Sequence, residues 1–365
     1  MEACQKGDAE AVSHLLRTGR GCSASQQDPH YRNGSSPLIE AARTGSLETC
    51  RILLEHGAPW NAIDKDGKCA GNYASDLGHQ SLVNYLVDVA VTAELLLGAS
   101  IRTEMSTTYT SKEATKPIVD IGTGSRCGGP VEHEPCTKSD FLSRDVCYVD
   151  GDKLLDGDGD AVMMEWERPL MRAHASVIMG GSGTSATGKV SVMNVGFGMG
   201  IIDSILQEEQ FSPALHVIVE AHPGVYAQMI KDGWDKKPNV RIVYGKWQDE
   251  VPKLIEEGIK FDGVFFDTYG EHFTDLEDFQ NLLVDLLKKP AGVYSFFNGL
   301  APDNIFFHGV ACQCVKLQLS GIGFNVEFAT CDIDVSDEAW KGVRRKYWHN
   351  CTYYLPIITW ANENS

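Results

Sequence analysis

The sequence has little positive charge for its size. Its 365 residues include 32 lysines and arginines against 50 aspartates and glutamates, a formal net charge of −18. This balance argues against direct binding of nucleic acid and suits a basic partner, although a solvated acidic exterior also explains it. The sequence also lacks a hydrophobic run that approaches the length of a membrane span, so we expect no membrane segment.

Paired cysteine spacing and a leader-like start are missing too. The 11 cysteines are scattered, and the first ten residues, MEACQKGDAE, contain neither the basic nor the hydrophobic region of a signal peptide. We therefore expect reduced thiols rather than a disulfide framework. The expected location is cytoplasmic, with the nucleus as an alternative.

An internal repeat occupies the first part of the chain. Four residues recur 33 residues later, which is the ankyrin period: Gly34, Ala41, Gly45 and Leu53 return as Gly67, Ala74, Gly78 and Leu86. The segment SSPLIEAARTG resembles the ankyrin consensus, and ACQKGDAEAVSHLLRTG is an earlier copy. We predict about three short, all-α ankyrin repeats over residues 1–97, which fold separately and dock a protein.

The rest of the chain divides into a linker and an α/β domain. Residues 98–140 are rich in Ser, Thr, Gly and Pro and are predicted to be a linker. From residue 141 to 365, strand-like and helix-like segments alternate, which predicts a doubly wound parallel sheet with a Rossmann-like fold. The predicted strands are 190–195, 215–220, 241–244, 263–267 and 292–297. Two later runs, 324–330 and 352–359, are predicted to form a hairpin at one sheet edge.

Three possible phosphate or metal motifs are incomplete. The run GTSATGKV at 183–190 resembles a phosphate-binding loop, but it precedes a strand instead of following one. Asp156, Asp158, Asp160 and Glu167 have calcium-loop spacing, but Ala161 stands where the sharp turn requires glycine. Cys312 and Cys314 lack a second ligand pair. We therefore predict no metal site.

A glycine-rich turn and a carboxylate follow the first two strands of the α/β domain. NVGFGMG places Gly196, Gly198 and Gly200 between a strand and a helix, where glycines let a ligand approach the backbone. Glu220 ends the second strand, where a carboxylate can accept both hydroxyls of a ribose. Together they favour a nucleoside cofactor over a plain tight turn.

The order of these motifs resembles class I S-adenosylmethionine-dependent methyltransferases. VMMEWERPLM (162–171), VGFGMG, VEAH, GKW and FFDTYG are similar to guanidinoacetate N-methyltransferase. Ankyrin repeats joined to such a domain resemble the protein arginine N5-methyltransferases, the type IV family of fungi and plants. The resemblance implies an enzyme that uses S-adenosyl-L-methionine to methylate the internal (δ, N5) nitrogen of arginine in a protein, with ribosomal proteins as candidate substrates.

The resemblance also implies roles for individual residues. Asp267 and Glu167 correspond to the two carboxylates that hold the substrate guanidinium. The implied cofactor contacts are Phe141, Met163, Met171, Gly196, Phe197, Gly198, Met199, Gly200, Ile201, Glu220, His222, Gly245, Lys246 and Asp267. The sequence departs from the small-molecule branch after the fifth strand, where FNGLAPDN (297–304) replaces a Leu-Thr-Ser run.

The two carboxylates also make chemical sense by themselves. A guanidinium is planar, has five N–H donors and stays protonated in water, so a pair of carboxylates is its natural receptor. The attacking nitrogen must offer a lone pair, and Asp267 is the candidate for removing its proton; alternatively, Asp267 only holds the substrate electrostatically. Tyr269 and Trp166, next to these carboxylates in the sequence, are candidates for the walls of the site or for core residues.

Two other functions remain open from the sequence alone. One is methylation of a small guanidino compound, which would not need the long binding surface of ankyrin repeats. The other is a non-catalytic ankyrin scaffold that binds the cofactor. The presence of Glu167, Asp267 and the glycine turn argues against the scaffold.

Overall fold

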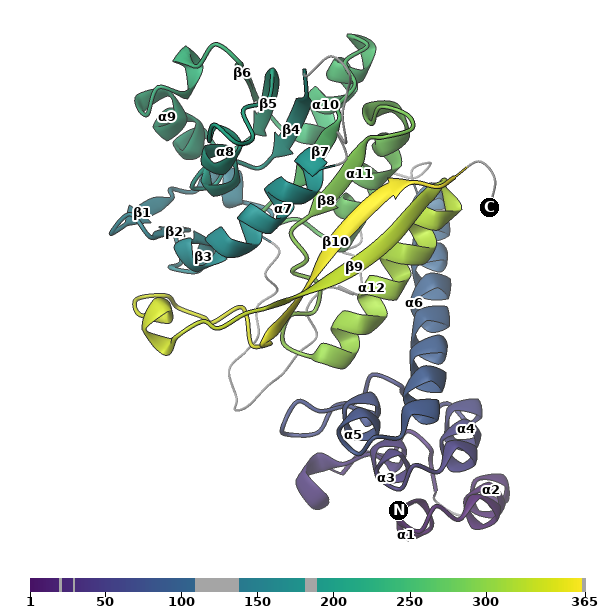
Figure 1. Cartoon of the computed structure of the whole chain (residues 1–365). Coiled ribbons are helices and arrows are strands. Elements are labelled where there is room, and N and C mark those ends of the chain that lie inside the picture. The colour runs from purple at the N-terminus through teal and green to yellow at the C-terminus, as the bar shows by residue number, and fades with distance from the viewer. Residues whose placement is uncertain (20–21, 29, 109–137, 181–188, 363–365) are drawn as a thin grey trace. The chain divides into compact units, whose positions relative to one another are not determined.

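The computed structural model describes residues 1–362 except 20–21, 29, 109–137 and 181–188 (Figure 1). The chain forms two compact units. The first contains Met1–Glu134 together with Leu300–Cys314, and the second contains Pro135–Gly299 and Val315–Ser365. Most of the predicted linker and most of the GTSATGKV run lie outside the described residues.

Three helix pairs make up the N-terminal unit, as the repeat period predicts. In chain order its helices are α1 (Glu2–Gln5), α2 (Ala9–Thr18), η1 (Arg32–Gly34), α3 (Pro37–Arg43), α4 (Leu47–Glu55), α5 (Ala70–Asp76) and α6 (Gln80–Thr108). Side chains cap the helices: Ser36 Oγ accepts the Ile39 N–H at 3.3 Å, and Pro37 occupies the first turn of α3. The turn from α3 to α4 passes through Gly45 at φ 71°, a left-handed conformation that favours glycine.

Helix α6 is longer and more hydrophobic than the sequence analysis indicates. It continues to Thr108, through the start of the predicted linker. Its stretch Gln80–Gly98, with a mean hydropathy of 1.4, is long and hydrophobic enough to cross a membrane. The prediction that the sequence has no hydrophobic run of this length is therefore wrong. Leu82, Leu86 and Ala90 on this stretch are fully buried in the ankyrin core. A single such helix is weak evidence for a membrane span; 22% of this stretch is buried inside the protein.

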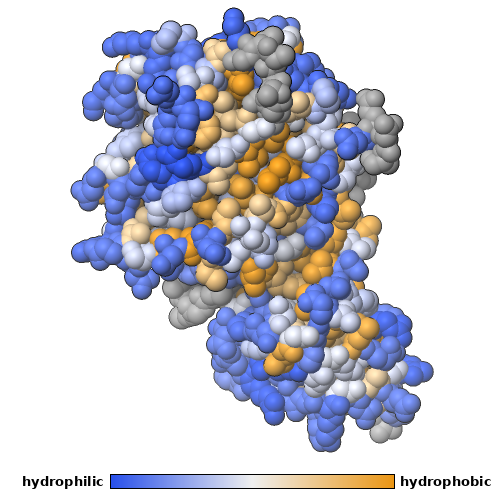
Figure 2. Space-filling model, in the orientation of Figure 1, coloured by the Kyte–Doolittle hydropathy of each residue, from blue (hydrophilic) through white to orange (hydrophobic). Residues whose placement is uncertain are grey.

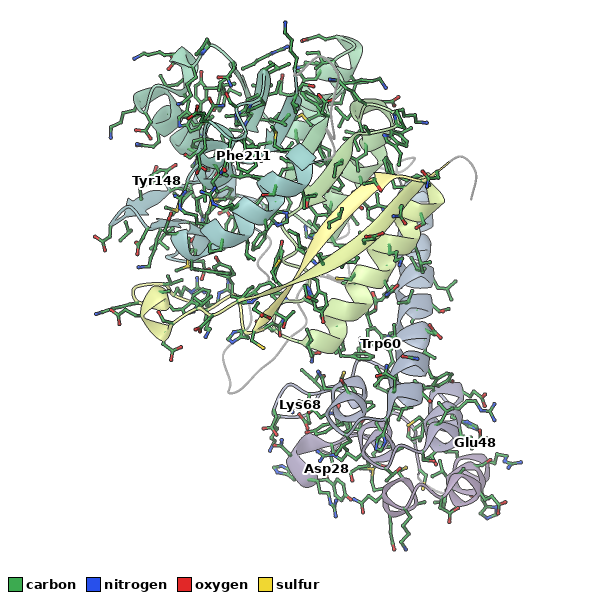
Figure 3. All side chains as sticks on the ribbon, viewed as in Figure 1. Asp28, Glu48, Trp60, Lys68, Tyr148 and Phe211 are labelled. Carbon is green, nitrogen blue, oxygen red and sulfur yellow. The ribbon has the colours of Figure 1, made fainter. Side chains whose placement is uncertain are left out.

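A segment from late in the chain completes the core of the N-terminal unit. Phe306, Val310 and Cys314, on the first part of α12 (Ile305–Gly321), are buried in the same hydrophobic cluster as the repeats. Trp60, labelled in Figure 3, packs edge-on against Phe307 with ring centres 5.6 Å apart. Cys312 and Cys314 are buried in this helix. The N-terminal unit is therefore not built from the repeats alone.

A seven-stranded sheet forms the centre of the second unit. Its strands are β4 (Ser191–Val195), β5 (Leu215–Glu220), β6 (Val240–Tyr244), β7 (Gly263–Phe266), β8 (Val293–Phe296), β9 (Phe324–Asp332) and β10 (Thr352–Trp360). Their order is β6-β5-β4-β7-β8-β10-β9. The first five are parallel, and β10 pairs antiparallel with both β8 and β9. The predicted strand series and edge hairpin are confirmed.

Helices cover both faces of this sheet, as Figure 1 shows. On one face lie α7 (Arg168–Gly180), α8 (Ile201–Leu206) and α9 (Pro223–Lys231); on the other lie α10 (Trp247–Glu256), α11 (Phe273–Leu286) and the last part of α12. The central strands are buried along their whole length, which is why they read as continuous hydrophobic runs. In Figure 2 hydrophobic residues gather over the middle of this unit, whereas its periphery is hydrophilic.

A small three-stranded sheet precedes the large one and is not predicted from the sequence. It consists of β1 (Cys147–Val149), β2 (Lys153–Leu155) and β3 (Ala161–Met164) in antiparallel order. The turn between β2 and β3 contains the calcium-like aspartates. Their carboxylates surround a lysine: Lys138 Nζ lies 3.0 Å from both Asp158 and Asp160 and contacts Asp156. An ammonium group therefore occupies the centre of this aspartate cluster.

Candidate functional site

A cavity of about 530 Å³ opens in the second unit, where the loops after β4, β5, β6 and β7 meet. Strands β4 and β7 are neighbours although they are far apart in the chain, so their carboxyl ends form the switch point at which doubly wound sheets bind ligands. The cavity size is within the usual range for small-molecule and cofactor sites, roughly 300–1,000 Å³. The predicted residues that line it are Phe141, Met163, Gly196, Gly198, Glu220, His222, Gly245, Lys246 and Asp267.

The glycine turn is required by a close backbone approach. A Cβ atom on Gly196 would lie 1.9 Å from the carbonyl oxygen of Asp267, and φ at Gly196 is 92°. A Cβ on Gly198 would meet the Met163 sulfur at 2.9 Å, and the Met199 N–H points to the same sulfur at 3.3 Å. Any larger residue at 196 would push apart the loops that follow β4 and β7.

Glu220 connects the ends of β4 and β5. It is only 6% exposed; its Oε2 accepts the Phe197 N–H at 2.8 Å, and its Oε1 accepts the His222 N–H at 2.6 Å. Burial raises the pKa of Glu220, and these backbone N–H groups oppose that change. Glu220 therefore fixes the two loops that border the cavity, in addition to facing it.

Aromatic rings form one wall of the cavity. Phe141 lies between His222 and Tyr269, with ring centres 4.7 and 4.8 Å away. The Lys138 N–H donates to the Gly270 carbonyl at 3.0 Å, and the Tyr269 hydroxyl reaches Asp156 at 3.0 Å. Residues 138–142, before β1, are thereby tied to the loop after β7. Tyr269 is thus a wall residue, one of the two alternatives that the sequence left open.

His222 is held in one tautomer by its neighbours. Its Nδ1 accepts the Gly224 N–H at 3.1 Å, so the proton resides on Nε2, which donates to the Arg144 carbonyl at 2.9 Å. In this form the imidazole is neutral. The His222 ring therefore packs against Phe141, while both of its nitrogens form hydrogen bonds with backbone groups.

The two predicted substrate carboxylates lie near each other. Glu167 ends the short helix η3 (Glu165–Glu167) and is 3% exposed, while Asp267 follows β7 and is half-buried. Burial, together with the charge of Asp267, raises the pKa of Glu167 to about 8. Burial, with the charge of Asp203, raises the pKa of Asp267 to about 7. In the described part of the chain, neither carboxylate forms an ion pair with a lysine or arginine.

Several predicted site residues do not reach the cavity wall. Met171, Phe197 and Ile201 are buried in the hydrophobic core beneath it, and Phe197 packs against Trp234 at 5.2 Å between ring centres. Met199 and Gly200 belong to the turn but are not on its cavity side. Glu167 is not a wall residue either. Phe197, Met199, Gly200 and Ile201 support the site from behind, because side chains in a turn cannot all face the same side.

Other wall residues are not anticipated by the sequence analysis. They are Lys138, Ser139, Leu142, Val162, Val195, Val219, Ala221, Val225, Trp247, Gln248, Asp249, Thr268, Gly270, Glu271, His272 and Asp275. Most of them end or follow one of the strands β4 to β7, so their position at the end of a parallel strand is the signal that could have identified them. Trp166, the other aromatic candidate, lies instead in a cluster with Trp340 and Tyr347 at ring distances of 5.8 Å.

The fold and this cavity define a Rossmann-like methyltransferase that carries N-terminal ankyrin repeats. Residues 131–306 match the guanidinoacetate N-methyltransferase family, and residues 1–95 match ankyrin repeats in three copies. The chain belongs to the protein arginine N-methyltransferase 2 family, as its relatives of that name show.

Three of these relatives are fungal proteins called protein arginine N-methyltransferase 2. The protein of Emericella nidulans is 34% identical over 90% of this chain and 80% of its own length. That of Eremothecium gossypii is 33% identical over 98% of this chain and 90% of its own. That of Saccharomyces cerevisiae is 33% identical over 86% of this chain and 78% of its own. These similarities support methylation of arginine in proteins.

Proposed function

We propose that the protein transfers a methyl group from S-adenosyl-L-methionine to the internal (N5) nitrogen of an arginine side chain in a protein. The observation that carries this proposal is the pair Glu167 and Asp267: two neighbouring carboxylates with raised pKa values and no paired lysine or arginine among the described residues. A guanidinium can bridge two such carboxylates with parallel N–H donors, and its charge would favour ionisation of both.

The residues around the cavity fit S-adenosylmethionine, the usual methyl donor of methyltransferases. Glu220 offers a carboxylate at the end of β5, where a ribose would lie in this fold, and Gly196 and Gly198 leave the backbone accessible. Phe141 and His222 provide ring faces for a base. When bound, the cofactor supplies an electrophilic methyl group on a positively charged sulfur.

Asp267 is the residue that we propose accepts the proton. It lines the cavity, unlike Glu167, and a pKa of about 7 matches what a general base needs near neutral pH. Glu167 would hold N–H groups of the two terminal nitrogens. Asp267 would then face the internal nitrogen and accept the proton of its N–H as the bond to the methyl group forms, which leads us to propose N5 as the site.

The protein substrate would reach the enzyme through the ankyrin repeats. Such repeats mediate protein interactions, and the net charge of −18 suits a basic partner. Ribosomal proteins, which the family resemblance implies as substrates, are our first candidates, and a cytoplasmic location, with the nucleus as an alternative, is part of the same proposal. The proposal does not include direct binding of nucleic acid.

The test uses the purified full-length chain with labelled S-adenosylmethionine and a cytosolic extract that contains ribosomal proteins. We expect label in a protein band rather than in small molecules. Label in guanidinoacetate alone would favour the small-molecule alternative. Absence of label would favour the non-catalytic scaffold. Fragmentation of the modified peptide then decides the nitrogen. Loss of methylamine would indicate a terminal nitrogen, whereas unmethylated carbodiimide loss, which leaves methylornithine, would support N5.

A further inference from the structure

The substrate carboxylate Glu167 is held by a side chain 180 residues later in the chain. The Tyr347 hydroxyl donates a hydrogen bond to Glu167 Oε1, and the Met164 N–H donates to the same oxygen at 2.9 Å. In the described part of the chain, Oε2 accepts no hydrogen bond. One oxygen of Glu167 is therefore fixed by the protein, and the other remains for a ligand.

Tyr347 is itself firmly placed. Its ring packs against Trp340 and Trp166, with ring centres 5.0 and 5.8 Å away. The residues beside it are anchored to the turn between β2 and β3: Arg345 pairs with Asp160 at 2.9 Å, and the Arg344 N–H donates to Gly159 at 2.8 Å. The hydroxyl is thus directed at Glu167 by a packed aromatic cluster.

The donor comes from outside the region matched to the guanidinoacetate N-methyltransferase family. That match ends at residue 306, whereas Tyr347 lies between η5 (Asp337–Trp340) and β10. Glu167 and Asp267 are both inside the matched region. The C-terminal part of the chain thus adds a contact to the carboxylate pair.

We infer that Tyr347 is a positioning residue that orients Glu167 for the substrate guanidinium and favours its ionised form. The identity of the substrate in this inference rests on the proposed function. The effect of Tyr347 on Glu167 does not. The hydroxyl donates only while protonated, and burial, with the charge of Glu167, raises the pKa of Tyr347 well above its usual value. The ionisable groups that act on Glu167 are Tyr347 and Asp267, and Asp203 acts in turn on Asp267.

The test compares Tyr347→Phe with Tyr226→Phe. Both variants remove one tyrosine hydroxyl, but only the first removes a group that touches Glu167; Tyr226 lies on α9 and stacks on Tyr244, away from the aromatic cluster. We expect Tyr347→Phe to raise KM for an arginine peptide about tenfold with a smaller change in kcat, since it removes one hydrogen bond to a charged group. The acid limb of kcat/KM should move upward by about one pH unit. Tyr226→Phe should change neither.

Two further measurements keep the inference separate from the proposed function. In a Glu167→Gln background, Tyr347→Phe should leave the acid limb unmoved, because the group it acts on no longer titrates. In the absence of substrate, the free energy of unfolding of the wild type falls as the pH rises toward the pKa of Glu167. In Tyr347→Phe this fall should continue to a higher pH. Equal pH profiles for wild type and Tyr347→Phe would overturn the inference, as would the same change in Tyr226→Phe. Absence of arginine methylation by the wild type would instead overturn the proposed function.

Discussion

Asn304 donates a hydrogen bond from its side chain to the side-chain oxygen of Asn72, 2.9 Å away, and to the Gly67 carbonyl at 3.0 Å. Asn72 lies in the third repeat helix pair, and Asn304 immediately precedes α12. Both asparagines are buried, so these bonds replace water that neither group can reach. The ankyrin repeats and residues 300–314 therefore form one folding unit.

This relationship changes what truncation is expected to do. Repeat stacks usually fold separately, and the sequence alone predicts that the ankyrin part can be removed. Deletion of residues 1–97 would expose Phe306, Val310 and Cys314, which are buried against the repeats. We expect the truncated chain to aggregate, as seen by size-exclusion chromatography. A monomeric truncated chain with an unchanged melting temperature would contradict this expectation.

A point substitution tests the same contact in the intact chain. Phe306→Ala removes a ring that is 7% exposed and should lower the free energy of unfolding of the N-terminal unit by about 3–5 kcal/mol. Leu317→Ala is the matched control, because Leu317 lies on the same helix but is 51% exposed. Denaturant unfolding of the two variants measures the difference. Similar unfolding midpoints for both would mean that the Phe306 contact contributes little.

Local sequence patterns predict the architecture but not the long-range contacts. The 33-residue period and the hydrophobic runs of β4, β5 and β7 each involve neighbouring residues, so both domains and the strand series are readable from the sequence. The positions of Gly196 and Glu220 at strand ends likewise predict that they border the cavity. Tyr347 carries no such signal, because its partner Glu167 is 180 residues away.

The aspartate cluster shows the same limit. Asp156, Asp158 and Asp160 have the spacing of a calcium loop, and only the fold places Lys138 among them. Burial alone would lower the pKa of Lys138, but the hydrogen bonds that its ammonium donates to the aspartates raise it, so the ammonium stays charged. Spacing identifies candidate ligands, whereas the cation that they bind depends on which side chain the fold brings in.

Replacing Glu220 should weaken binding of S-adenosylmethionine. Glu220→Gln keeps the size of the side chain but removes its charge, and we expect a loss of about 1.5–3 kcal/mol in binding free energy. Glutamine is preferable to alanine, because it keeps one of the two oxygens that accept the buried N–H groups of Phe197 and His222, whereas alanine removes both. Titration calorimetry measures the affinity, with Glu257→Gln, an exposed site paired with Arg241, as control. Unchanged affinity in Glu220→Gln would exclude a direct role for this carboxylate.

The raised pKa of Glu167 predicts how stability depends on pH. The folded protein holds the proton up to about pH 8, whereas the unfolded chain releases it near its ordinary value of 4.5. Stabilisation from the protonated form is therefore complete below about pH 4.5 and is lost as the pH rises through 8. The side chain at 167 in Glu167→Gln cannot lose a proton. At pH 8.5 the free energy of unfolding of this variant should therefore be about 1–3 kcal/mol higher than that of wild type, and at pH 5 the difference should be smaller.

Denaturant unfolding at these two pH values measures this effect. Glu165→Gln is the control, since it removes a carboxylate two residues away that is 40% exposed and pairs with Arg168 instead. A Glu167→Gln protein whose stability follows wild type at both pH values would show that Glu167 is ionised in the folded state throughout.

Asp267→Asn should separate catalysis from cofactor binding. The variant keeps the shape of the side chain but loses the charge and the proton acceptor, so single-turnover methylation of an arginine peptide should slow by about 10²–10⁴-fold. Affinity for S-adenosylmethionine should change much less. Since the pKa of Asp267 is about 7 and that of Glu167 is about 8, wild-type kcat/KM should rise with pH through both values and then level, and the variant should keep only the contribution of Glu167 to this acid limb. Asp285→Asn, which removes an exposed carboxylate on α11 away from the cavity wall, should retain both the rate and the pH profile. If Asp267→Asn still methylates at a rate close to wild type, the proton must leave by another route, and Asp267 would serve only to hold the substrate.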